Sequence, residues 1–203
     1  NGTLGTNAVT VAGGIFGGNG VINGPVIATA GSLAPGNNSI GALTVSSDVT
    51  LSPGSTAAME LSPGTNDLLS VSGTLHYDGT LSVVNLSGSL SGGQSFKLFD
   101  APAATGNFAN ISGSPGPGLD WGFNPGDGVL TVYSTVSTNV DVSMANGPLP
   151  LSWQKDPLGW HLQVQTNSLT GNWVDLPDTA AVTSVTNLID PSNGAVFFRL
   201  IYP

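Results

Sequence analysis

Apolar residues in the first two thirds of the chain occur in short runs separated by turn-forming residues. From residue 1 to about residue 136, runs of about three to five residues alternate apolar and polar side chains, and Gly, Ser, Thr, Asn or Pro bounds each run. Such alternation places successive side chains on opposite faces of a β-strand. No stretch repeats at the 3.6-residue period of an amphipathic helix. The pattern predicts an all-β fold, with strands such as Val9–Val11, Leu43–Val45, Val49–Leu51, Ala58–Leu61 and Leu81–Val83.

Strands this short are stable only in combination. A single hairpin is marginal in water, whereas many short strands at close spacing are typical of a solenoid in which each coil buries its apolar positions on the next. The composition agrees, because 29 Gly and 14 Pro among 203 residues supply turns and only 7% of the residues are charged. We therefore expect residues 1–137 to form a parallel β-helix.

One stretch of this region carries a more specific motif. Its core is Gly31-Ser32-Leu33-Ala34-Pro35-Gly36-Asn37, followed by Gly41-Ala42-Leu43-Thr44-Val45. These residues closely resemble the autotransporter-associated (passenger-associated transport) repeat of secreted bacterial β-helix proteins. Residues 67–81 resemble the coils that follow that repeat, and residues 95–108 resemble its aromatic-rich closing section. The resemblance covers residues 17–134, and it implies a secreted right-handed β-helix (β-solenoid) that is a scaffold without catalytic residues.

The character of the sequence changes near residue 138. Trp153, Trp160 and Trp173 follow this point, and the strand-like segments become longer. Sequential strands with short turns favour antiparallel pairing, so we expect residues 138–203 to form a small antiparallel β-sandwich-like module. This part resembles the C-terminal β modules of large secreted proteins from environmental bacteria, a resemblance that implies no known activity. The expected strands are Leu149–Gln154, Trp160–Gln165, Asn172–Leu176, Val182–Leu188 and Ala195–Tyr202.

Missing residue types exclude several classes of function. Cysteine is absent, which excludes thiol nucleophiles, disulfides and thiolate metal sites. Three cations stand against 12 acidic residues, so the chain has no basic patch for nucleic acid. The sequence contains no run of 18 apolar residues, which is about the length that a membrane-spanning helix needs. The first residues lack the basic start and apolar segment of a signal peptide. The resemblance to secreted β-helix proteins implies an extracellular or cell-surface protein, so we expect that its signal has been removed or lies outside this chain.

Catalytic and metal sites find little support in the sequence. Polysaccharide lyases and hydrolases with a β-helix need a basic residue or a pair of carboxylates, but the first 136 residues hold one lysine, Lys97, and their acids lie mostly in or beside turns. His76 alternates with apolar neighbours as an outward strand residue does, and no motif joins it to His161. We expect no catalytic residue, no metal and no cofactor, and a polysaccharide enzyme remains a remote alternative.

The sequence offers two kinds of candidate surface site, a carbohydrate contact and glycosylation acceptors. Trp160 follows Pro157 and Gly159, so we expect its ring to be exposed and available to stack on a sugar, whereas Trp153 and Trp173 lie among apolar alternates as core residues do. Asn-X-Ser/Thr triplets, the acceptors of N-glycosylation, begin at Asn1, Asn37, Asn85 and Asn110.

The ends of a solenoid suggest a function. A terminal coil exposes backbone groups and apolar interior unless a cap covers it, and this sequence is coil-like from its first residues. We expect a secreted non-enzymatic structural protein whose copies assemble end to end or by strand addition into a fibre, surface layer or matrix. The alternative is a carbohydrate-binding or adhesion module that binds polysaccharide. The candidate assembly residues are Val9, Val11, Ile15, Phe16, Phe197 and Phe198.

Overall fold

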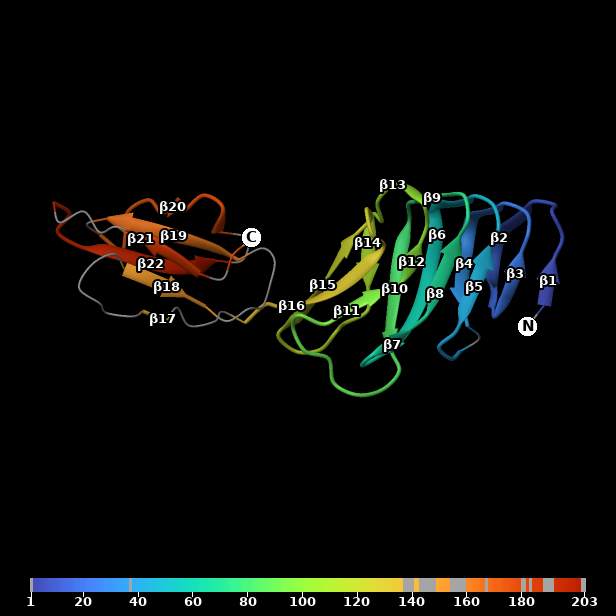
Figure 1. The fold of residues 1–203 in the computed structure, drawn as a ribbon, viewed down its shortest axis with the longest axis horizontal. Helices are drawn as coiled ribbons and strands as arrows, with labels where there is room; N and C mark the ends of the chain where they lie inside the picture. Colours follow the sequence, from blue (N-terminus) through green and yellow to red (C-terminus); the bar gives the residue numbers. More distant parts are fainter. Residues whose placement is uncertain are drawn as a thin grey trace. The chain divides into compact units, whose positions relative to one another are not determined.

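The computed structural model describes residues 2–36, 38–136, 141–142, 149–153, 160–166, 168–179, 182, 184–187 and 192–201. These residues form strands and turns and no α-helix, which confirms the predicted all-β class. The chain divides into two compact units, Asn1–Val132 (unit 1) and Tyr133–Pro203 (unit 2), whereas the sequence places the change at residue 138. Both units are drawn in Figure 1.

The first sheet of unit 1 is parallel throughout. Each strand pairs with the next member of the set, so segments about 20 to 30 residues apart in the sequence lie side by side (Figure 1). In order across the sheet, the strands are β1 (Gly2–Leu4), β3 (Gly20–Ile22), β5 (Ala42–Val45), β8 (Leu68–Val71) and β12 (Phe99–Asp100).

The second sheet is built from the segments that follow those strands. Its longest strand, β6 (Val49–Ser62), pairs in parallel with two shorter strands that follow it in the chain, β9 (Thr74–Tyr77) along its first part and β10 (Thr80–Asn85) along its second part. β7 (Thr65–Asn66) folds back antiparallel on the end of β6. The other strands are β2 (Val9–Gly18), β4 (Val26–Pro35), β13 (Ala103–Gly106) and β14 (Asn110–Ser112).

The described residues of unit 1 therefore form five structural repeats. Each repeat gives one strand to the first sheet and one bent or two short strands to the second. We number the repeats along the chain: residues 2–18, 20–35, 42–62, 68–85 and 99–112.

The sequence prediction of strands of three to five residues is wrong for β2, β4 and β6. These strands have 10, 10 and 14 residues. The pairing of β2 with β4 shifts register between Val11 and Ala12, and that of β4 with β6 shifts between Ala28 and Ala30. Such bulges bend a strand without ending its pairing, so one strand continues where the sequence indicates two.

The core of unit 1 is built from inward side chains stacked in register. Val26 pairs with Val49, Val49 with Leu75 and Leu75 with Ala104, and the first three are fully buried. Leu33, Ala57 and Leu81 form a second buried row. Burial of apolar area at about 25 cal/mol per Å² is the main stabilising contribution of such rows.

Polar side chains hold the repeats together at their corners. The Asn19 Oδ1 accepts the N–H of Ala42 at 2.8 Å, and the Asp48 Oδ1 accepts the N–H of Thr74 at 2.7 Å. In both cases the donor belongs to a later repeat. These bonds satisfy backbone groups that a turn leaves unpaired.

The far end of unit 1 is closed. β11 (Ser95–Lys97) pairs antiparallel with β16 (Val129–Ser134), which also pairs with β15 (Leu119–Asn124), and this sheet lies at the opposite end of the unit from β1 (Figure 1). Beside it, the rings of Tyr77, Phe99, Phe108 and Phe123 form a cluster with centroids 5.2–5.6 Å apart. Offset and edge contacts of this kind are favourable.

Unit 2 contains two antiparallel sheets among its described residues. Their core is formed by Leu151, Trp153 and Leu162. One sheet has β17 (Asp141–Val142), β18 (Leu149–Ser152) and β21 (Ser184–Asn187), and the other has β20 (Val174–Asp175), β19 (His161–Thr166) and β22 (Val196–Ile201).

Candidate functional site

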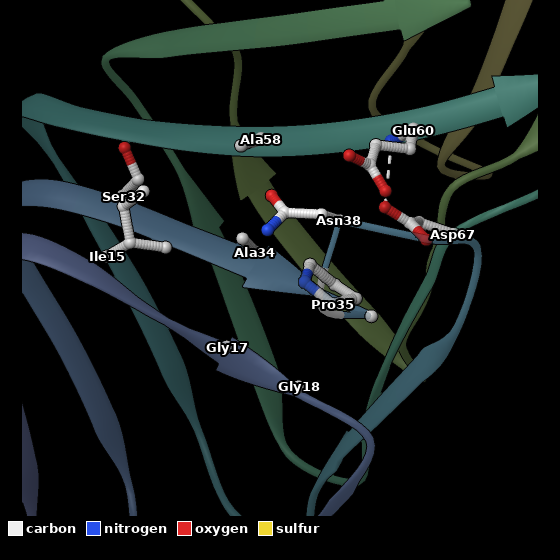
Figure 2. Close-up of a pocket in the computed structure, with 11 residues that line it drawn as sticks. Ile15, Gly17, Gly18, Ser32, Ala34, Pro35, Asn38, Ala58, Glu60 and Asp67 are labelled. Carbon is white, nitrogen blue, oxygen red and sulfur yellow. Dashed lines mark hydrogen bonds between the residues drawn. The ribbon is translucent and has the colours of Figure 1, made fainter. Parts of the chain in front are cut away.

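A groove of about 350 Å³ crosses the outer face of the second sheet in unit 1 (Figure 2). Its floor is flat because outward positions on three neighbouring strands are small: Gly17, Ala34 and Ala58. Gly17 and Ala34 are register partners. Ile15 and Ser32 lie toward one end, and Asn38 from the segment after β4 covers the middle (Figure 2). Glu60 and Asp67 line the other end.

Asp67 is the most constrained polar residue of the groove. Its side chain is fully buried, with 0% exposed. The Gly41 N–H donates to Oδ1 at 2.8 Å, and the Glu60 N–H donates to Oδ2 at 2.7 Å. Burial raises the pKa of Asp67 to about 6, the nearby Glu60 carboxylate adds to the rise, and the two backbone hydrogen bonds oppose it. The carboxyl group thus joins the third repeat to the segment that precedes β5.

Glu60 gives this end of the groove an acceptor. Its Oε2 is buried and has no hydrogen-bond partner among the residues that the structure describes, and Figure 2 shows its side chain beside Asp67. A pair of carboxyl groups serves acid–base or nucleophilic chemistry when its oxygens face the substrate. Here both Asp67 oxygens accept backbone N–H groups, so this carboxyl group of the pair serves to tie two backbone segments together.

A second hollow, of about 290 Å³, lies at the start of unit 1. It is lined by residues of the first three repeats, among them the apolar Leu4, Phe16, Ile22 and Leu43, and by glycines and the polar Thr3 and Asn19. The strands around it are unpaired on one side, since among the described residues β1 pairs only with β3 and β2 only with β4. We call the free sides of β1 and β2, together with this hollow, the first-repeat edge.

The predicted assembly residues of unit 1 lie on β2 at this edge, and their side chains differ in exposed fraction. Ile15 is 79% exposed, whereas Val11 is buried. Val9 and Phe16 are partly buried and pack against the core. The exposed positions Leu4 and Ile15 and the half-covered Phe16 are therefore the apolar contacts that the edge offers.

The predicted sites of unit 2 are placed differently from the expectation. Trp160, expected to be exposed, is only 6% exposed, and its Nε1–H donates to the Ser134 carbonyl at 3.3 Å. Its flanking residues 154–159 lie outside the described residues. Phe198 packs against the core of unit 2. Phe197 is its neighbour on β22, so its side chain lies on the opposite face of the strand, where it is half-buried.

Trp173, expected in the core, lies instead beside polar groups. The Arg199 guanidinium carbon is 4.3 Å from the centroid of its ring, a cation–π contact. Arg199 Nε–H donates to Gln163 Oε1 at 2.8 Å, and Gln163 Nε2–H donates to Asp175 Oδ1 at 2.8 Å. No local sequence pattern indicates this group, because Gln163, Asp175 and Arg199 lie on three different strands and Trp173 precedes one of them.

The candidate glycosylation residues have different surroundings. Asn37 lies outside the described residues, Asn110 is exposed on β14, and the Asn85 side chain donates to the Gly88 carbonyl while its Oδ1 is buried. His76 is exposed, as predicted, and its Nδ1 is 2.9 Å from Thr105 Oγ1.

In the part of the chain that the structure describes, no three His, Asp or Glu residues are grouped to hold a metal ion. Nor does that part contain an apolar helix of membrane-spanning length.

Comparison with known proteins adds no assignment: no protein-family model and no curated protein matches this chain.

Proposed function

We propose that unit 1 is a right-handed parallel β-helix and that the protein is a secreted, non-enzymatic structural protein whose copies associate through the first-repeat edge. The observation that carries the proposal is the stack of repeats in unit 1, in which each repeat covers the strand edge of a neighbouring repeat. Among the described residues, the free sides of β1 and β2 beside the hollow are the edge that a further repeat of this kind would cover, and the opposite end of the stack is closed by an antiparallel sheet and an aromatic cluster. An unpaired strand edge is a template for strand addition.

The β-helix is supported by the order of the repeats. Successive repeats place their strands in the same order in both sheets, and every contact between neighbouring repeats in the first sheet is parallel. Secretion is supported by the resemblance of residues 17–134 to the autotransporter-associated repeat. A structural role is supported by the groove, where the oxygens of Asp67 are held by backbone donors.

The closed end limits how copies assemble. The first-repeat edge by itself joins two copies through the same surface, which gives a closed dimer. A fibre, layer or matrix needs a second contact surface. Phe197, on the strand β22 and partly exposed, is the predicted assembly residue of unit 2 that remains available, since Phe198 packs in the core.

Leu4→Lys tests the assembly edge. Leu4 is 46% exposed and lines the hollow, so a lysine places an unpaired charge where a partner would pack while disturbing the monomer little. We expect self-association of the purified chain, measured by sedimentation velocity over a wide concentration range, to weaken by at least about tenfold.

The matched control is Leu86→Lys. Leu86 is 44% exposed but lies outside the hollow, and we expect this variant to associate like the parent chain. Electron microscopy of the native material then shows whether the product is a dimer, a fibre or a layer. A parent chain that stays monomeric at every concentration overturns the proposal, as does equal weakening by both substitutions.

A second candidate function, carbohydrate binding, is favoured by the surroundings of Trp173. An indole ring with guanidinium, amide and carboxylate groups beside it provides the apolar face and the hydrogen-bonding groups that a saccharide requires. For this candidate we expect soluble oligosaccharides to shift the tryptophan fluorescence of the parent chain, and Trp173→Ala to abolish the shift. Val174→Ala, at an exposed neighbouring position, is the control that keeps it. No shift with any of a panel of neutral and acidic oligosaccharides rejects the candidate.

A further inference from the structure

Arg199 is the only arginine of the chain, and among the described residues no carboxylate forms an ion pair with it. Its side chain is exposed. Its Nε–H donates to Gln163 Oε1 at 2.8 Å, and its guanidinium carbon lies 4.3 Å from the centroid of the Trp173 ring. Neither contact involves a negatively charged group. Within the part of the chain that the structure describes, the two terminal nitrogens of the guanidinium therefore keep their N–H donors for a ligand.

The guanidinium is held in one orientation by its neighbours. Gln163 is the register partner of both Asp175 on β20 and Arg199 on β22, so the three side chains form a row across the sheet, which we call the arginine row. Asp175 Oδ1 accepts the Gln163 Nε2–H at 2.8 Å, and this bond fixes the Gln163 amide with its Oε1 toward Arg199. A guanidinium that is already oriented loses less conformational entropy when a ligand binds.

The carboxylate of the arginine row is too distant to neutralise Arg199. Asp175 and Arg199 lie on β20 and β22, with β19 between them. Neighbouring strands are about 4.7–4.9 Å apart, so the backbones of the two residues are separated by about 10 Å. That separation is about one Debye length at 0.1 M salt, so the attraction between these exposed charges is largely screened. The row thus presents a local positive charge on a chain whose net charge is −9.

Apolar side chains lie beside Arg199 on the same face of the sheet. Phe197 and Ile201 are two residues before and after it on β22, and both are half-buried. The Trp173 ring is half-buried as well. The C–H faces of sugar rings pack against apolar and aromatic side chains of this kind.

We propose that the arginine row and Trp173 bind the carboxylate of an acidic saccharide, such as a chain of uronic acids. The proposal rests on the carbohydrate-binding candidate described above, and it adds the class of saccharide. A uronate carboxylate accepts charge-assisted hydrogen bonds from the two terminal nitrogens of the guanidinium. A neutral sugar in the same place would remove water from the charge without compensating it.

A galacturonic acid tetramer and its methyl ester are matched probes, because esterification removes the charge and keeps the sugar rings. Binding to the full chain is measured by isothermal titration calorimetry at low salt. The Arg199 Nε–H signal is followed by NMR, in which the only arginine of the chain gives one such signal. We expect saturable binding of the acid with a shift of that signal, and an affinity for the ester at least about tenfold lower.

Arg199→Gln should weaken binding of the acid by at least about tenfold, because the variant retains no positive charge at this position. Lys97→Gln is the matched control, since it removes the same charge from an exposed position of unit 1, and it should bind the acid like the parent. The comparison of acid and ester on the parent chain does not depend on the folding of any variant.

Three results would overturn the proposal: the ester binds as tightly as the acid, Arg199→Gln binds the acid like the parent, or a glutamate peptide of equal charge binds as tightly as the acid. Failure of this proposal is distinct from failure of the carbohydrate candidate. Equal binding of acid and ester that Trp173→Ala abolishes retains carbohydrate binding and rejects the acidic class alone. No binding of any oligosaccharide rejects both, and neither result bears on self-association.

Discussion

The free energy of unfolding of unit 1 should fall as the pH rises through the range from about 4 to about 6, by up to about 3 kcal/mol. The cause is Asp67, whose pKa is raised from 3.8 to about 6 by burial. The folded state therefore holds this proton more tightly than the unfolded state. The stabilisation is complete below pH 3.8 and is lost as the pH passes 6, which is opposite to the usual effect of a carboxylate in an ion pair.

Asp67→Asn is the variant that isolates this effect. The amide has no proton to lose in this range, so we expect its stability to be flat between pH 4 and pH 6. Denaturant unfolding followed by the fluorescence of Trp121, a buried residue of unit 1, is a suitable measurement. Asp100→Asn, at an exposed carboxylate, should keep the slope of the parent. An unchanged slope in Asp67→Asn would contradict the assignment to Asp67.

Gly79→Ala should destabilise unit 1 by about 2–5 kcal/mol. Gly79 has a φ of +70°, and an added Cβ atom would lie 2.3 Å from the Ser55 carbonyl oxygen of the preceding repeat. Left-handed backbone at an alanine costs about 1–2 kcal/mol, and forcing the two repeats apart adds about 1–3 kcal/mol.

Gly64→Ala separates the two contributions. Gly64 also has a positive φ, of +84°, but a Cβ atom there meets nothing within 4 Å. We expect it to lose only the backbone contribution of about 1–2 kcal/mol. Equal losses in the two variants, measured by the same unfolding experiment, would show that the contact between repeats contributes nothing at Gly79.

The strand pattern could be predicted because it depends on local alternation. The alternation of Leu81, Ser82 and Val83 predicts a strand with both apolar residues on one face, and both are buried. The length of β6 could not be predicted in the same way. Pro53 and Gly54 indicate a break between two strands, yet both lie within β6, where the backbone bends and pairing with β4 continues through Gly54. Turn formers do not distinguish a bent strand from two separate strands.

The site residues were harder to predict, because their environment depends on distant partners. Asp67 precedes a strand like an ordinary turn residue, and its burial depends on donors from Gly41 and Glu60. The neighbouring Pro157 and Gly159 suggested an exposed Trp160, but its indole reaches a carbonyl 26 residues away. Trp173 alternates like a core residue, yet Arg199 covers its ring. No local pattern reports such contacts.

The closed end of unit 1 also imposes an order on folding. The aromatic cluster requires Tyr77 and Phe123 together, so it forms only when most of the unit is available. A chain made from its N-terminus therefore exposes Tyr77, in the fourth repeat, before its partner Phe123 exists. The repeats contact only their neighbours, so folding of such a stack begins at any repeat and spreads to the next. Completion of the aromatic cluster is thus a late step, which closes a stack that neighbouring repeats have already built.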